Sequence, residues 1–130
     1  RLNEFVKRRR KIIEIYKSGF KNNPYFDMPE EKEYACSSYH ICVIKLKDKF
    51  IPHRKEIFSA FRKIGIGAQV HYIPVYKQPY YRDLGYKDGV YPNAEDFYSR
   101  AISIPIYPMM KDSDAVLAIK RILKVLKLFG

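Results

Sequence analysis

The stretch YHICVIKL, residues 39–46, is rich in β-branched and apolar side chains and predicts one buried strand. Upstream of it, apolar residues recur at helical spacing, and Gly19 lies just past them as a helix stop. The stripe they form consists of Leu2, Phe5, Val6, Ile12, Ile13 and Tyr16. The segment between this helix and the strand is polar and contains two prolines, which predicts a loop.

A helix and a second strand are predicted on the other side of residues 39–46. Pro52 is tolerated in the first turn of a helix, and Gly65 closes that helix. The inner face of this helix is predicted to be Ile57, Phe58, Phe61 and Ile64. Ala68–Val75 predicts the second strand, which ends or lies at an edge because Pro74 cannot donate a backbone hydrogen bond.

Residues 76–130 predict a long loop, a short helix, a short extended segment and a final helix. The loop, residues 76–93, is rich in tyrosine, which indicates an ordered surface. Asp112 or Ser113 is the expected N-cap of the last helix. Its buried stripe is predicted to be Val116, Ile119, Leu123 and Leu126. This order predicts an α+β fold, with helices packed on a small, largely antiparallel sheet.

The composition favours a single basic domain with an anionic partner. The chain has 130 residues and a formal net charge of +11, which suits nucleic acid, a membrane surface or a phosphorylated small molecule. The run RRRK, residues 8–11, predicts either the solvated face of a helix or a nucleic-acid-binding arm. No apolar run approaches the roughly 20 residues of a membrane span, so we expect a cytoplasmic protein.

The cysteines and histidines raise the question of a metal site. Cys36, His40 and Cys42 share the same parity, so in a strand they would face one way. Their spacing matches no standard zinc pattern, and a fourth ligand is not evident. We therefore expect no metal and interpret them as buried strand residues.

The stretch GIGAQVHYIPVYKQPYY, residues 65–81, predicts one wall of a ligand site. His71 is the strongest functional candidate among the three histidines, because it follows a glycine-rich turn and leads into the tyrosine-rich loop. Gln69, His71 and Tyr72 offer hydrogen bonds to hydroxyls and phosphates, and tyrosine rings stack on bases or sugars. No catalytic motif is evident elsewhere in the chain.

Three blocks of sequence together resemble a known enzyme family. They are SSYHICVIKL, GIGAQVHYIPVYKQPYY and YPNAEDFYSRAISIPIYPMMKDSD. In this order they resemble the C-terminal part of the sugar-nucleotide aminotransferases of the DegT/DnrJ/StrS family, which depend on pyridoxal phosphate. The second block most resembles members that aminate a UDP-linked 4-keto-6-deoxy-N-acetylhexosamine in pseudaminic acid or spore coat polysaccharide biosynthesis. Many relatives carry histidine where this chain has Tyr76.

The resemblance implies a two-domain enzyme of fold type I, usually a homodimer, with an amino-acid donor such as glutamate. Residues 1–130 would be its small C-terminal domain, with residues 1–20 as a connecting helix. The large domain, with the cofactor and its Schiff-base lysine, would lie outside this chain. The chain would therefore hold no catalytic residue and would be inactive alone.

The resemblance also implies which residues contact the nucleotide sugar. His71 and Tyr72 would be polar contacts, Gln69 and Val70 would supply backbone and wall, and Tyr76 is a weaker candidate. Two alternatives remain open. The chain could be a stand-alone basic module that binds nucleic acid or another polyanion, although it carries no known nucleic-acid motif. It could also be a remnant that serves only as a dimer interface.

Overall fold

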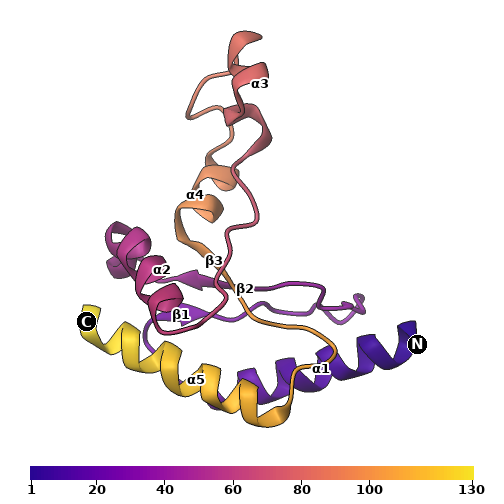
Figure 1. The fold of residues 1–130 in the computed structure, drawn as a ribbon. Helices are drawn as coiled ribbons and strands as arrows, with labels where there is room; N and C mark the ends of the chain where they lie inside the picture. The colour runs from indigo at the N-terminus through magenta and orange to yellow at the C-terminus, as the bar shows by residue number, and fades with distance from the viewer.

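The computed structural model describes all 130 residues and confirms the α+β class (Figure 1). Its α-helices are α1 (Leu2–Gly19), α2 (Arg54–Lys63), α3 (Pro79–Asp83), α4 (Pro92–Arg100) and α5 (Asp112–Leu126). Its strands are β1 (Phe26–Asp27), β2 (Cys42–Leu46) and β3 (Ala101–Ile104). Short 3₁₀ turns cover Asp48–His53, Val75–Lys77 and Lys127–Phe129.

The sheet is a small antiparallel layer in the order β1-β2-β3. Strand β2 is central, as its β-branched sequence predicts, and it lies opposite β3 with Ile44 facing Ile102. Figure 1 shows α1 and α5 side by side beneath this sheet, with α2 at one end. The buried faces of the sheet and helices form one continuous hydrophobic core.

The helices bury only part of the stripes that periodicity predicted. In α1, Ile12, Ile13 and Tyr16 are buried, but Leu2 and Phe5 are exposed because the first turns extend past the sheet (Figure 1). In α5 the buried face is rotated from the predicted one, and Val116 is exposed. The buried residues of α5 are Ala115, Ala118, Ile119, Ile122, Val125 and Leu126. Lys111, and not Asp112 or Ser113, is the N-cap of α5.

The strand predicted at Ala68–Val75 is absent. Only Gln69 pairs with a strand, through a single antiparallel bridge to Ser103 of β3. The backbone then leaves the sheet, and Pro74, which has no backbone N–H, is followed at once by a 3₁₀ turn. The segment is thus an irregular connection that starts at the sheet edge.

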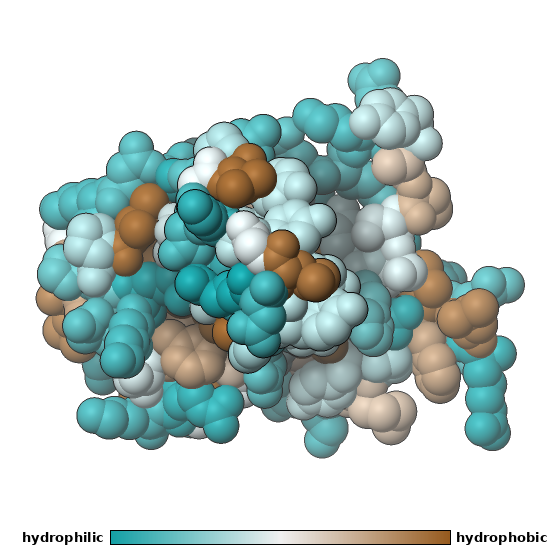
Figure 2. Space-filling view, turned by 90° about the horizontal axis from the view of Figure 1, so that it is seen from above, coloured by the Kyte–Doolittle hydropathy of each residue, from teal (hydrophilic) through white to brown (hydrophobic).

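An arm formed by residues 75–95 rises from the sheet on the side away from α1 and α5 (Figure 1). Its tyrosines pack mainly on one another, with ring centroids 4.9 Å apart for Tyr76 and Tyr91 and 5.3 Å for Tyr80 and Tyr81. The predicted loop is therefore ordered, and it contains the short helix α3. Figure 2 looks down on this arm and shows apolar groups set apart among polar ones.

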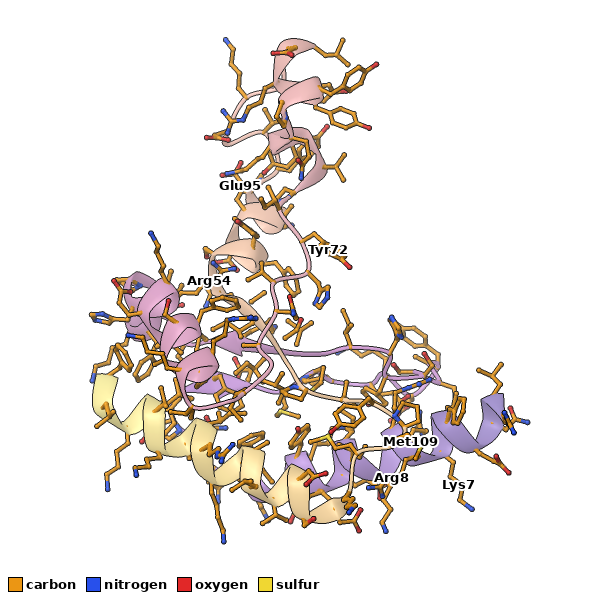
Figure 3. The ribbon with its side chains drawn as sticks, in the orientation of Figure 1. Lys7, Arg8, Arg54, Tyr72, Glu95 and Met109 are labelled. Atoms are coloured by element: carbon orange, nitrogen blue, oxygen red, sulfur yellow. The ribbon has the colours of Figure 1, made fainter.

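The RRRK run belongs to α1 and is bound into the fold. Arg8 donates hydrogen bonds to the carbonyl of Met110 and, over 2.6 Å, to the carboxylate of Asp112. Figure 3 shows Arg8 beside the loop that carries Met109. Arg10 holds Glu31 through two hydrogen bonds of 2.7 Å. The run thus lies on a helix, as one of the two alternatives predicted, but these two arginines are only partly solvated and tie α1 to neighbouring loops.

Candidate functional site

The predicted wall lines a cavity of about 320 Å³ where the chain leaves the sheet. Gln69, His71 and Ser103 line this cavity, together with residues that precede β2 and residues that follow β3. Three segments far apart in sequence thus meet at one edge of the sheet. Such a concave site with a few convergent polar groups is typical of a small-molecule site.

The backbone of Gln69 fixes the start of this wall. Its N–H donates to the carbonyl of Ser103 over 3.0 Å, and its carbonyl accepts from the N–H of Ser103 over 2.8 Å. The Gln69 side chain is exposed and makes no hydrogen bond within the chain. Its amide is therefore available to a ligand, while its backbone is held to the sheet.

His71 is the most strongly positioned of the predicted side chains. Its Nδ1 lies 2.7 Å from the hydroxyl of Ser103, and its ring meets that of Tyr72 edge-on at a centroid distance of 4.7 Å. The ring is half-buried, and Nε2 makes no hydrogen bond within the chain. His71 therefore offers one unused ring nitrogen at the cavity.

Val70 and Tyr72 lie beside the cavity and do not line it. Val70 is half-buried. Tyr72 is 76% exposed, and Figure 3 shows its side chain pointing outward at the base of the arm. The structure thus brings Tyr72 against His71 and leaves its hydroxyl free.

Tyr76 is separate from this cluster and belongs to the base of the arm. It is buried, and its hydroxyl donates to Glu95 of α4 over 2.7 Å. Lys77 lies 3.3 Å from both Glu95 and Asp88. Burial and the bond to Glu95 raise the pKa of Tyr76 to about 12, whereas the same bond holds the pKa of Glu95 below its usual value. These contacts orient the arm, and the Tyr76 hydroxyl is already occupied.

The structure also answers the question about the cysteines. Cys36 is exposed, and Cys42 is buried in β2, where burial raises the pKa of its thiol to about 12. Cys36 and His40 lie outside the strands and are exposed, so the interpretation of all three as buried strand residues is correct only for Cys42. No group of three His, Cys, Asp or Glu residues is placed to hold a metal ion.

Sequence reasoning missed Ser103. It lies in the short segment ISIPIYP, where only an extended conformation was predicted. Its one available signal was polarity, because it is the only hydroxyl residue in an otherwise apolar strand. Its partner His71 lies 32 residues away, so no local pattern joins the two.

Comparison with known proteins identifies the family. Residues 1–123 match the model of the DegT/DnrJ/EryC1/StrS aminotransferase family. The chain is 33% identical over 130 residues to the spore coat polysaccharide biosynthesis protein SpsC of Bacillus subtilis, covering 98% of this chain and 33% of the relative. It is 35% identical over 115 residues to the UDP-4-amino-4,6-dideoxy-N-acetyl-β-L-altrosamine transaminase of Campylobacter jejuni, covering 88% of this chain and 30% of the relative.

Solved structures agree with the family match. Helicobacter pylori PseC, an aminotransferase involved in the biosynthesis of pseudaminic acid, superposes with a TM-score of 0.89 and 31% identity, over 95% of this chain and 33% of PseC. The sugar aminotransferase Spr1654 of Streptococcus pneumoniae, in its apo form, gives a TM-score of 0.92 at 25% identity, over 99% and 32% of the two chains. The chain therefore belongs to the DegT/DnrJ/EryC1/StrS aminotransferase family, and it spans about a third of the length of these relatives.

The residues that line the cavity at Gln69 and His71 do not form a pyridoxal phosphate site by themselves. The Spr1654 structures include forms with pyridoxal phosphate and with pyridoxamine phosphate, and the family is dependent on this cofactor. The cavity of this chain is lined by neither lysine nor arginine. It therefore offers no amine to bind the cofactor aldehyde and no cation to bind its phosphate.

No helix of the structure combines the length and the apolar character needed to cross a membrane.

Proposed function

We propose that this chain is the small C-terminal domain of a pyridoxal phosphate-dependent sugar-nucleotide aminotransferase. The complete enzyme would aminate the 4-keto group of a UDP-linked 4-keto-6-deoxy-N-acetylhexosamine, with glutamate as donor, for surface polysaccharide or nonulosonic acid biosynthesis. It would act as a cytoplasmic homodimer. Residues 1–20 would connect this domain to a large domain that carries the cofactor and its lysine.

One observation gives the main support for this proposal. Gln69 and His71, chosen first from their chemistry and then from the family resemblance, meet at one cavity, and that cavity lies within the residues that match the family. The cavity has polar groups suited to hydroxyl and carbonyl oxygens but no residue suited to the cofactor. Such a wall fits the substrate side of an active site shared between two domains.

The role of this chain in the reaction is to bind and orient the sugar nucleotide. Pyridoxal phosphate, when bound by the rest of the protein, supplies the electron sink for amino transfer. The Gln69 amide and the His71 ring would hydrogen-bond to the sugar, and Tyr72 would cover it from the base of the arm. Holding the sugar in one orientation favours reaction at a single carbonyl carbon.

Removing the His71 side chain from the complete enzyme tests this role. His71→Ala is expected to raise KM for the UDP-linked 4-keto sugar by roughly 2- to 12-fold, the value of one neutral hydrogen bond, with kcat nearly unchanged. His53→Ala is the matched control, because His53 is exposed on a different turn and does not line the cavity. Equal kinetics for His71→Ala and the wild type would remove His71 from the site.

The isolated chain provides a second test. We expect the 130 residues alone to bind no pyridoxal phosphate and to catalyse no amino transfer, because the cavity lacks a lysine. Turnover by the isolated chain would contradict the assignment as a small domain.

The alternative of a polyanion-binding module rests on the net charge of +11 and on the RRRK run, and the contacts of two of these arginines weaken the second support. The arginines at positions 8 and 10 are committed to Met110, Asp112 and Glu31. DNA binding measured at several salt concentrations tests this alternative. We expect only weak binding. A tight complex whose affinity falls steeply with salt would favour the polyanion-binding module instead.

A further inference from the structure

Apart from the buried tyrosines and Cys42, Ser103 is the only residue with a polar or charged side chain that the fold buries, with 3% of its surface exposed. It interrupts the apolar strand β3 between Ile102 and Ile104, which are both buried in the core. A buried hydroxyl is costly unless it is hydrogen-bonded. The presence of serine at this position therefore calls for a partner that makes use of the hydroxyl.

The partner of this hydroxyl is the His71 ring, and no other group in the chain bonds to it. The Oγ atom lies 2.7 Å from Nδ1 of His71. A hydroxyl can donate one hydrogen and accept others, whereas a neutral imidazole has one nitrogen that donates and one that accepts. The direction of this bond thus decides which ring nitrogen of His71 carries the hydrogen.

The surroundings of Ser103 favour one direction. Its buried hydroxyl hydrogen has a single acceptor within reach, Nδ1 of His71. If Nδ1 carried the hydrogen and donated to Oγ, the hydroxyl hydrogen of Ser103 would be left unpaired in the protein interior, which is unfavourable. Neutral His71 is therefore expected to accept at Nδ1 and to carry its hydrogen on Nε2.

We propose that Ser103 is a positioning residue, which holds His71 as the Nε2–H tautomer so that this N–H donates to an acceptor oxygen of the ligand. Nε2 has no partner in the chain, and His71 lines the 320 Å³ cavity. A neutral donor at this point suits a hydroxyl, carbonyl or phosphate oxygen. The assignment of this oxygen to a sugar nucleotide rests on the proposed function. The assignment of the tautomer is independent of the proposed function.

The backbone of Ser103 supports the same role independently. Its N–H and C=O both bond to Gln69, two residues before His71, over 2.8 and 3.0 Å. Tyr72 also packs edge-on against this ring, at a centroid distance of 4.7 Å. Ser103 thus fixes both the backbone that leads to His71 and the rotation of its ring.

The tautomer can be measured directly in the complete protein. With ¹⁵N-labelled histidine at alkaline pH, the ring nitrogens of a neutral imidazole give distinct signals for the two tautomers, and the signals that His71→Gln removes are those of His71. We expect the Nε2–H form for His71, a mixture of forms in Ser103→Ala, and recovery of the Nε2–H form in Ser103→Thr. A wild-type Nδ1–H form overturns the proposal, even if Ser103→Ala does not fold.

Kinetics separate this proposal from the proposed function. In the complete enzyme, Ser103→Ala is expected to raise KM for the UDP-linked 4-keto sugar by roughly 2- to 12-fold. The double variant with His71→Ala should be no worse than His71→Ala alone, because both changes remove one interaction. If the two substitutions raise KM by factors that multiply in the double variant, the positioning role of Ser103 is overturned. If the wild type does not use a sugar nucleotide at all, the proposed function fails, and the tautomer measurement alone decides the role of Ser103.

Discussion

Tyr16→Phe tests how the helix α1 is fixed to the rim of the cavity. Tyr16 is fully buried, and its hydroxyl donates to the carbonyl of Pro105 over 2.7 Å. Pro105 follows β3 and lines the cavity. Burial raises the pKa of Tyr16, so the hydroxyl keeps its hydrogen over the whole usable pH range. Phenylalanine would keep the ring, which stacks on Phe20 at 5.6 Å, and would remove the hydroxyl with its bond to Pro105 and its weaker contact with the sulfur of Met110.

The expected loss follows from leaving the Pro105 carbonyl without its partner. An unpaired buried acceptor costs about 1–3 kcal/mol. With a urea dependence of about 1.5 kcal/mol per M, a loss of about 2 kcal/mol lowers the unfolding midpoint by more than about 1 M. Circular dichroism during urea unfolding measures this midpoint.

Tyr107→Phe is the matched control for this measurement. Tyr107 lies in the same segment as Pro105, it is 47% exposed, and its hydroxyl makes no hydrogen bond within the chain. The control is expected to change the free energy of unfolding by less than about 0.5 kcal/mol. If both variants unfold at the same urea concentration, the Tyr16 bond does not stabilise the fold and this reasoning is refuted.

Two further predictions concern packing and pH. Gly19→Ala is expected to destabilise the fold by about 1–3 kcal/mol, because the new Cβ would lie 3.1 Å from Cγ1 of Ile119. Gly67→Ala is the control, because the nearest atom to its new Cβ lies at 3.9 Å. This control should leave the free energy of unfolding nearly unchanged in the same assay. The Arg10 side chain, together with the backbone N–H of Ser37, lowers the pKa of Glu31 from its usual 4.5 to about 2. The stability from this lowered pKa is present above pH 4.5 and is lost as the pH falls toward 2. Glu31→Gln should flatten the acid limb of a stability-against-pH curve, and an unchanged limb would contradict this assignment.

Sequence periodicity predicted the helices well and their faces less well. The turns of α1 around Ile12 and Tyr16 are buried as expected, because an apolar stripe at helical spacing needs a surface to cover. Leu2 belongs to the same stripe but lies beyond the edge of the sheet. Periodicity gives the direction of an apolar face, but it does not give the extent of the layer that covers it.

The candidate site was predicted in part. His71 and Gln69 were chosen from the sequence, and both line the cavity. The predicted strand that would have carried them is absent, because only Gln69 finds a backbone partner before the chain turns into the arm. Tyr76 was a weaker candidate from the family resemblance, and its hydroxyl bonds to Glu95 and is thereby occupied.

The sequence by itself determined the α+β class, the helix positions and the family resemblance, since these depend on patterns within short stretches of chain. Tertiary structure alone decided that Ser103 meets His71 and that Arg10 binds Glu31. These pairs are separated by 32 and 21 residues. A buried hydroxyl or a guanidinium can be satisfied by many partners, and only the folded chain fixes which of them comes within hydrogen-bonding distance.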